Sequence, residues 1–330
     1  MAEESMAEES GASAAATADG PPDTAPSEER RCGFVAVMGA PNAGKSTLVN
    51  RLVGAKVSIV THKAQTTRAA LRGVALHGAS QIILVDTPGI FDPRRRLDRA
   101  MVGAAWGGAE GADDIVLTVD VASRVDPAKI AAPIIEGLRD AGRTGARGAV
   151  LALNKIDLLA RPKLLDLAAR LNEEGAFRET FMISAQNGDG VEDLKARLAE
   201  RMPLGPWHYP EDQIADAPQR WLAAEVTREK LFLRLHDELP YAATVETESW
   251  KPVKKGGIRI EQTIYVERDG QKAIILGKGG RAIKEIGAAA RAELTEQLGQ
   301  PVHLFLFVKV RKGWADDPAR YRQMGLDIVE

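Results

Sequence analysis

Short apolar segments alternate with helical stretches through the first two thirds of the chain. Five of these segments have the length of a buried strand and carry no charged residue, and they span 34–38, 81–85, 115–119, 149–153 and 180–183. A helix is expected over 191–201, between Gly190 and Pro203. Strands that alternate with helices predict an α/β domain with a mixed, mostly parallel sheet and helices on both faces.

A different order of elements begins near residue 219. A helix is expected over 219–238, followed by two alternating strands at 244–250 and 258–267, two helices flanking 277–280, and a strand at 303–310. This order predicts a smaller α+β domain of roughly a hundred residues, which is enough to fold independently.

The chain therefore divides into four parts. Residues 1–30 are acidic and lack apolar periodicity, so we expect a disordered tail. Residues 31–203 form the first domain and residues 220–330 the second. The intervening 204–219 are rich in proline, which predicts a linker.

Charge is distributed unevenly along the 330 residues. The 44 Lys and Arg residues and 46 Asp and Glu residues give a formal net charge of −2. Eight of the acids and none of these bases lie within residues 1–29, which leaves 44 bases against 38 acids in the rest.

The lone Cys32 excludes an intramolecular disulfide and a four-thiol zinc site. No apolar run approaches the ~18 residues of a spanning helix, so we expect a cytoplasmic protein.

A phosphate-binding loop follows the first expected strand. Its residues read G-x-x-x-x-G-K-S and precede a helix. The glycines let backbone N–H groups point at phosphate oxygens, Lys45 adds positive charge, and the Ser46 hydroxyl is a hard ligand for Mg²⁺. The expected contacts are Gly39, Ala40, Pro41, Asn42, Ala43, Gly44, Lys45, Ser46 and Thr47.

A second motif, Asp86-Thr87-Pro88-Gly89, ends the strand at 81–85. An aspartate at the carboxyl end of a strand beside the first loop is suited to hold Mg²⁺ through water. The Gly89 N–H is suited to sense the γ-phosphate.

A third motif, Asn154-Lys155-Ile156-Asp157, indicates that the base is guanine. The Asp157 carboxylate matches the ring N–H and exocyclic amine of guanine, whereas adenine would leave a buried charge unpaired. We expect Lys155 to lie along the base and Asn154 to brace the loops. In the fourth motif, Ser184-Ala185-Gln186, the Ala185 N–H is expected to donate to the guanine carbonyl.

Glycines in the second domain suggest an RNA site. A G-K-G-G sequence at 277–280 separates two helices, and within 268–291 six bases accompany two acids. Such a loop lets a helix end approach a nucleic-acid backbone, although a plain helix–helix turn fits the motif equally well. The predicted RNA contacts are Gly277, Lys278, Gly279, Gly280, Arg281 and Lys284. For Phe305 and Phe307 we favour core packing over base stacking.

These motifs carry a family resemblance. The first domain resembles translation-factor-class GTPases, and Gln65-Thr66-Thr67-Arg68 resembles switch I of the bacterial Era family. The second domain is similar to a type II KH domain, and residues 306–317 resemble the C-terminal signature of the same family. The resemblance covers about residues 33–330.

The resemblance implies the ligands and the sites. GTP or GDP would bind with Mg²⁺, which would meet Ser46, Thr67 and, through water, Asp86; Thr66 is the alternative to Thr67. Asn42 matches a loop asparagine that helps to bind K⁺ in related GTPases, which we carry as a hypothesis. Ile90 stands where signalling GTPases place a water-positioning glutamine, so intrinsic hydrolysis is expected to be slow.

The resemblance also implies the partners. The KH domain would bind the single-stranded 3′ end of small-subunit (16S) ribosomal RNA, and the protein would act as a monomeric, nucleotide-gated factor in small-subunit assembly. The family also allows peripheral contact with the cytoplasmic face of the membrane. The alternative function is an RNA-binding chaperone in which GTP is a structural ligand with negligible turnover, and Ile90 favours it. A signalling GTPase fits less well because the sequence has no lipidation motif.

Overall fold

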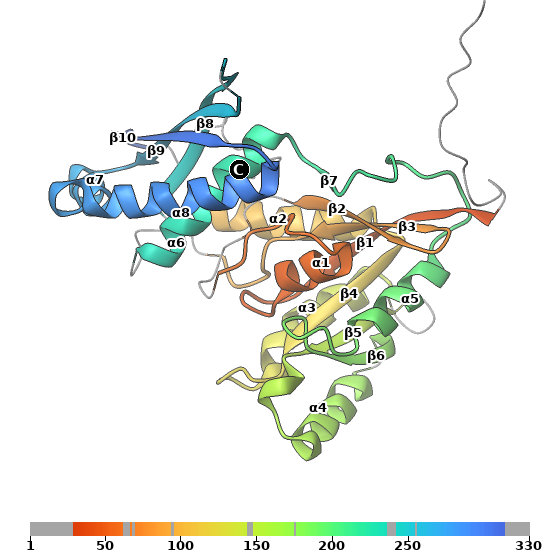
Figure 1. Ribbon diagram of the computed structural model, residues 1–330. Coiled ribbons are helices and arrows are strands. Elements are labelled where there is room, and N and C mark those ends of the chain that lie inside the picture. Colours follow the sequence, from red (N-terminus) through yellow and green to blue (C-terminus); the bar gives the residue numbers. More distant parts are fainter. Residues whose placement is uncertain are drawn as a thin grey trace, which may run out of the picture.

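The computed structural model describes residues 29–61, 67, 70–93, 96–143, 148–174, 176–235, 242–254 and 256–313. The expected tail therefore lies outside the described residues except for its last two positions. Gln65, Thr66 and Arg68 of the expected switch I segment also lie outside them. Two sheets organise the described part of the chain, one in each predicted domain (Figure 1).

The first sheet has seven strands in the order β6-β5-β4-β1-β3-β2-β7. They are β1 (Arg31–Met38), β2 (Leu71–His77), β3 (Ser80–Asp86), β4 (Asp114–Asp120), β5 (Ala149–Asn154), β6 (Phe177–Ile183) and β7 (Ala215–Asp216). All neighbouring strands from β6 to β3 pair in parallel, whereas β2 pairs antiparallel with both β3 and β7. The parallel strands bring their carboxyl ends to one edge of the sheet, where the first three predicted motifs begin.

Helices cover both faces of this sheet, as predicted. They are α1 (Lys45–Val53), α2 (Arg96–Glu110), α3 (Pro127–Asp140), α4 (Arg161–Glu173) and α5 (Val191–Arg201). Side chains of β1 alternate between the two cores because successive residues of a strand face opposite sides. Val35 and Val37 pack with residues of α1 and α5, and Ala36 and Met38 pack with residues of α2, α3 and α4.

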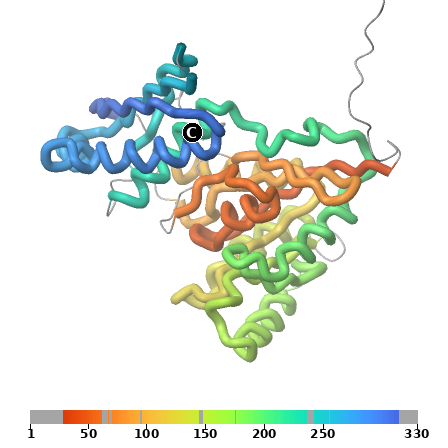
Figure 2. The backbone as a smooth tube through the Cα atoms, in the orientation of Figure 1, coloured from red at the N-terminus to blue at the C-terminus, as the bar shows by residue number. Residues whose placement is uncertain are grey.

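The expected linker is packed against the first sheet. Gln81 on β3 donates to the Tyr209 carbonyl at 2.8 Å and accepts from the His208 and Tyr209 N–H groups at 2.9 and 3.0 Å. Farther along, β7 pairs with β2. Figure 2 shows this connecting segment, residues 203–218, running along the first domain toward the second. The prolines predicted a break in periodicity correctly, but they did not predict this attachment.

The second sheet has three strands in the order β10-β9-β8, namely β8 (Ala243–Pro252), β9 (Ile258–Val266) and β10 (Val302–Val310). Its helices are α6 (Gln219–Arg234), α7 (Asp269–Leu276) and α8 (Arg281–Leu298). Ile260 and Ile264 of β9 are fully buried in the core between this sheet and the helices. The predicted α+β domain is confirmed.

The expectation for Phe305 and Phe307 is wrong. Their side chains are 41% and 49% exposed, although the intervening Leu306 packs against the core. The reason is that helices cover only one face of the second sheet, so alternate residues of β10 face solvent. The Arg259 guanidinium lies 4.3 Å from the centre of the Phe305 ring on this open face.

No helix in the described ranges combines the length and the apolar character needed to cross a membrane.

The exposed position of Phe307 predicts a small effect on stability. Phe307→Ala should lower the free energy of unfolding by less than about 1 kcal/mol. Ile264→Ala removes a fully buried side chain and should cost about 2–5 kcal/mol. Urea denaturation of both variants measures the difference, and equal losses would contradict the open sheet face.

Candidate functional site

The loop between β1 and α1 requires glycine at both ends. Gly39 and Gly44 have φ angles of 148° and 93°, which L residues rarely adopt. A Cβ at Gly39 would lie 2.3 Å from the Thr118 carbonyl oxygen, and one at Gly44 would lie 2.2 Å from Nδ2 of Asn154. The loop is therefore packed closely between the ends of β4 and β5. It leads directly into the N-terminus of α1, where backbone N–H groups can bind an anion.

Lys45 lies inside this loop. Its Nζ donates to the carbonyl oxygens of Gly39 at 3.1 Å and Ala40 at 2.9 Å. Burial lowers the pKa of Lys45 to about 8, and the neighbouring Asp86 carboxylate only partly opposes this shift. An anion bound in the loop would favour the charged form of Lys45.

Three oxygen-bearing side chains converge next to the loop. Ser46 Oγ donates to Asp86 Oδ2 at 2.7 Å, and Thr67 Oγ1 lies 2.9 Å from Ser46 Oγ and 3.4 Å from Asp86 Oδ2. This is the trio predicted for Mg²⁺, with Thr67 in the place expected of the mobile hydroxyl. The alternative, Thr66, lies outside the described residues.

The oxygen atoms of Ser46, Thr67 and Asp86 are suitable ligands for Mg²⁺. Asp86 is fully buried, which raises the pKa of its carboxyl group despite the hydrogen bond from Ser46 and the charge of Lys45. Its Oδ1 atom has no hydrogen-bond partner in the described part of the chain. A buried, unpartnered carboxylate oxygen beside two hydroxyls provides the hard oxygen ligands, direct or through water, that Mg²⁺ prefers.

The rest of the second motif packs against the phosphate loop. Thr87 Oγ1 donates to the Val37 carbonyl at 2.8 Å, and a Cβ at Gly89 would lie 2.9 Å from the Pro41 nitrogen. Pro88 lies between them. The Ile90 N–H donates to the Gly39 carbonyl at 3.1 Å, and the Ile90 side chain packs in the core shared with α2, α3 and α4. The Ile90 side chain is therefore buried, and being apolar it has no group that could hydrogen-bond to a water.

Asn154 joins three loops, as predicted for a bracing residue. Its Nδ2 donates to the Ala43 carbonyl at 2.8 Å, and its Oδ1 accepts from the Ala185 N–H at 3.0 Å. The sequence predicted that the Ala185 N–H donates to the guanine carbonyl, but in the structure it donates to Asn154. A guanine carbonyl would have to share the Ala185 N–H with Asn154.

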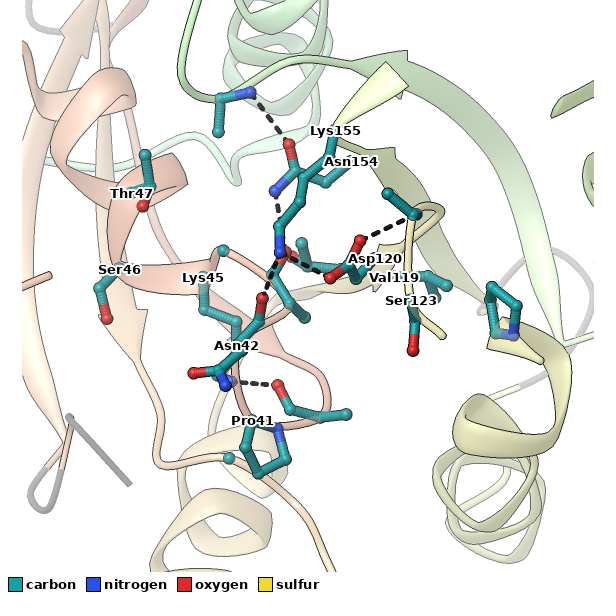
Figure 3. Close-up of a pocket in the computed structure, with 18 of the residues that line it drawn as sticks. Pro41, Asn42, Lys45, Ser46, Thr47, Val119, Asp120, Ser123, Asn154 and Lys155 are labelled. Atoms are coloured by element: carbon teal, nitrogen blue, oxygen red, sulfur yellow. Dashed lines mark hydrogen bonds and ion pairs between the residues drawn. The ribbon is translucent and has the colours of Figure 1, made fainter. Parts of the chain in front are cut away.

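Lys155 crosses the site rather than extending into solvent (Figure 3). Its Nζ lies 2.8 Å from the Asn42 carbonyl oxygen and 2.6 Å from Asp120 Oδ2. The sequence analysis did not predict a role for Asp120. Asp120 ends β4 just as Asp86 ends β3, and this position at the end of a strand could have identified it. The K⁺ site at Asn42 stays a prediction.

The remaining base motifs line the same cavity. Asp157 lies in a short 3₁₀ helix (Ile156–Leu158), its side chain is exposed, and no described residue hydrogen-bonds to its carboxylate. Ser184 is buried and accepts from the Asn187 N–H at 3.2 Å, while the Gln186 carbonyl accepts from Arg51. The carboxylate of Asp157 is thus available to a base.

One cavity of about 860 Å³ connects these features. It is lined by the phosphate loop, by Asn154, Lys155 and Asp157, and by Ser184, Ala185 and Gln186. Its volume lies within the range of about 300–1,000 Å³ that is typical of small-molecule sites. Ile59, Val60, Thr61 and Thr67 close another side.

The glycine loop of the second domain is exposed between α7 and α8. Gly277, Gly279 and Gly280 all have positive φ angles, and a Cβ at Gly277 would lie 2.7 Å from that of Ala282. Lys278, Arg281 and Lys284 are exposed, and none forms an ion pair with a residue that the structure describes. Three cations thus surround the start of α8, where N–H groups favour a phosphate.

Comparisons with known proteins match both domains. The family model described as 50S ribosome-binding GTPase matches residues 34–155, and a KH domain model matches residues 238–315. GTPase Era of Sinorhizobium medicae is 62% identical over 313 residues, covering 94% of this chain and 99% of that protein. GTPase Era of Brucella suis is 60% identical over 300 residues, covering 91% and 94%.

Solved structures show the same two-domain arrangement. A variant of Aquifex aeolicus Era bound to GDP and aluminium fluoride is 36% identical, with a TM-score of 0.81 over 89% of this chain and 99% of that one. A structure of Era in complex with Mg²⁺, GDPNP and nucleotides 1506–1542 of 16S ribosomal RNA is also 36% identical, with a TM-score of 0.82 and coverage of 90% and 99%.

The lowered pKa of Lys45 predicts proton uptake on nucleotide binding. Phosphates favour the charged lysine, so affinity should be nearly independent of pH below 8 and should fall as the pH rises through about 8. In buffers of different ionisation enthalpy without Mg²⁺, calorimetry of GDP binding should show an uptake of about half a proton at pH 8 and clearly less at pH 7. Equal uptake at both pH values would contradict the assignment.

The free carboxylate of Asp157 predicts the base specificity. Asp157→Asn should lower affinity for GDP by about tenfold to a hundredfold, because hydrogen bonds to a charged group are lost. It should raise affinity for XDP, because the amide can donate to the carbonyl that replaces the guanine amine. The exposed Asp166→Asn on α4 is the matched control. Retained selectivity for GDP over XDP in Asp157→Asn would overturn the assignment.

Proposed function

The chain belongs to the Era family of GTPases, and from this premise we propose that its nucleotide state controls RNA binding by its second domain. The protein binds GTP and hydrolyses it to GDP and phosphate. The observation that carries the proposal is that one chain contains both a cavity lined by the phosphate loop, Asn154 and Asp157 and an exposed, cationic glycine loop. The two are held on sheets that share a connecting helix, α6.

Each residue that lines the nucleotide cavity has a proposed role. The N–H groups of the phosphate loop bind the phosphates, and Lys45 exchanges the Gly39 and Ala40 carbonyls for phosphate oxygens. Ser46, Thr67 and Asp86 would hold Mg²⁺, which supplies charge neutralisation at the phosphates when bound. We propose that the Gly89 N–H contacts the γ-phosphate. Because Ile90 packs in the core, it cannot orient water, which supports a slow intrinsic rate.

The RNA partner follows from the family. A related Era structure contains nucleotides 1506–1542 of 16S ribosomal RNA, and we infer that this chain binds the corresponding 3′ end of small-subunit ribosomal RNA. Gly277, Gly279 and Gly280 leave the backbone of the loop open to a phosphate, and the adjacent cations favour one. This partner supports a role in assembly of the small ribosomal subunit.

The remaining features belong to the same proposal. The GTPase domain spans residues 31–203 and the KH domain residues 220–330, with 204–219 as the attached connection. We also propose that the protein is a cytoplasmic monomer that meets the assembling small ribosomal subunit. Peripheral contact with the membrane is a further expectation from the family.

The glycine loop provides the test of RNA binding. Lys278→Asp with Gly279→Asp should weaken binding of an RNA of nucleotides 1506–1542 by at least about tenfold, because negative charge replaces a phosphate contact. Lys163→Asp, an exposed change on α4, is the control. Fluorescence anisotropy measures the affinity, and a thermal melt shows that the variant is folded. Unchanged affinity in the folded double variant would refute the KH assignment.

A further inference from the structure

Residues 56–60 of the GTPase domain contact two helices of the KH domain. Lys56 Nζ lies 2.7 Å from Glu229 Oε2 on α6 and 2.6 Å from Glu293 Oε1 on α8. The backbone N–H of Val60 donates to Glu229 Oε1 at 2.8 Å. One carboxylate of the second domain thus accepts two hydrogen bonds from a short segment of the first.

Glu229 depends on these donors because its side chain is only 3% exposed. Burial alone would raise the pKa of Glu229, but hydrogen bonds from Lys56, Lys230 and Val60 outweigh it and hold the pKa below its ordinary value. Of these three donors, only Lys230 belongs to the second domain. Movement of the segment 56–60 would leave a buried carboxylate with one donor, which is costly.

The same segment forms part of the nucleotide cavity. Ile59 and Val60 line the cavity, so the residue whose N–H binds Glu229 also faces the nucleotide site. Asn50 of α1 fixes the segment from the other side. Its Oδ1 accepts from the Val57 and Ser58 N–H groups at 2.9 and 2.8 Å, and its Nδ2 donates to the Ser58 carbonyl at 2.7 Å. Through α1, the segment is tied to the phosphate loop.

A second attachment joins α6 to the strand that follows Thr67. Arg72 and Gly73 of β2 pair with Asp216 and Ala215 of β7, and α6 begins three residues after β7 ends. Trp221 and Leu222, at the start of α6, pack against the core formed by α1 and α5. The chain before Thr67 is therefore attached to α6 through residues 56–60, and the chain after Thr67 is attached to β7, the strand that leads into α6.

Helix α8 connects this junction with the RNA loop. It begins at Arg281, directly after the glycine loop, and Glu293 lies three turns farther along. At about 1.5 Å per residue, the two positions are roughly 18 Å apart on one helix. If the pairing of Lys56 with Glu229 were lost, α6 and α8 could shift together as a rigid unit and move the glycine loop.

We propose that Glu229 is the residue that couples the nucleotide cavity to RNA binding, by pairing with Lys56 and the Val60 N–H in one nucleotide state and losing part of this pairing in the other. The proposal rests on the proposed function and specifies its regulation. A ligand can shift a two-state equilibrium only through contacts that differ between the states, and these hydrogen bonds supply such a difference.

The experiment compares RNA affinity in two nucleotide states. The full chain is loaded with Mg²⁺ and either GDP or a non-hydrolysable GTP analogue, and the Kd for the RNA of nucleotides 1506–1542 is measured in each. The ratio of the two Kd values reports the coupling. Glu229→Gln and Lys56→Met should each bring this ratio about fivefold or more closer to one. Because the pairing differs between the two nucleotide states, both variants should also shift the ratio of the affinities for the GTP analogue and for GDP.

Glu285→Gln is the matched control, because Glu285 of α8 pairs with Arg234 of α6 within the KH domain. It should keep the wild-type ratio. The double variant Lys56→Met with Glu229→Gln should lose less coupling than the sum of the two single losses, since both variants remove the pair of Lys56 with Glu229. A wild-type ratio in folded Glu229→Gln and Lys56→Met would overturn the proposal. A wild-type protein that does not bind the RNA in either state would instead refute the proposed function.

Discussion

The buried carboxylate of Asp86 is the constraint on which the nucleotide site depends. It lies at the end of β3, where the parallel pairing with β1 brings it beside the phosphate loop. A buried carboxylate is stable only with nearby cations or donors, and Lys45, Ser46 and Thr67 are arranged around it. Its free Oδ1 atom then leaves one position to be satisfied by a bound ion.

A second buried carboxylate, Glu229, has the corresponding role between the domains. Asp86 takes its donors from the GTPase domain, whereas Glu229 of the KH domain takes donors from residues 56–60. These residues lie between the phosphate-loop helix and Thr67, so the two carboxylates are connected by one short stretch of chain. A change in the position of residues 56–60 would therefore affect both the nucleotide site and the RNA-binding domain.

The sequence predicted the local parts of this architecture well. The phosphate loop, the Asp86 motif and the Asn154 motif each depend on residues close together in the chain and on the end of a strand, so spacing and apolar pattern were enough. Contacts between distant residues were not predictable in this way. Three contacts each join residues more than thirty positions apart: the pairing of β7 with β2, the ion pair of Asp120 with Lys155, and the contacts of Glu229 with residues 56–60. Phe305 and Phe307 were misjudged because alternation shows that a strand has two faces but does not show which is covered.

Coupling between the two sites is reciprocal, so it can be measured from either site. If the nucleotide state changes RNA affinity, RNA must change nucleotide affinity by the same factor. The ratio of the affinities for a Mg²⁺-bound GTP analogue and for GDP should therefore shift by at least about fivefold when the RNA of nucleotides 1506–1542 is present at saturation. The same ratio with and without saturating RNA would contradict the account.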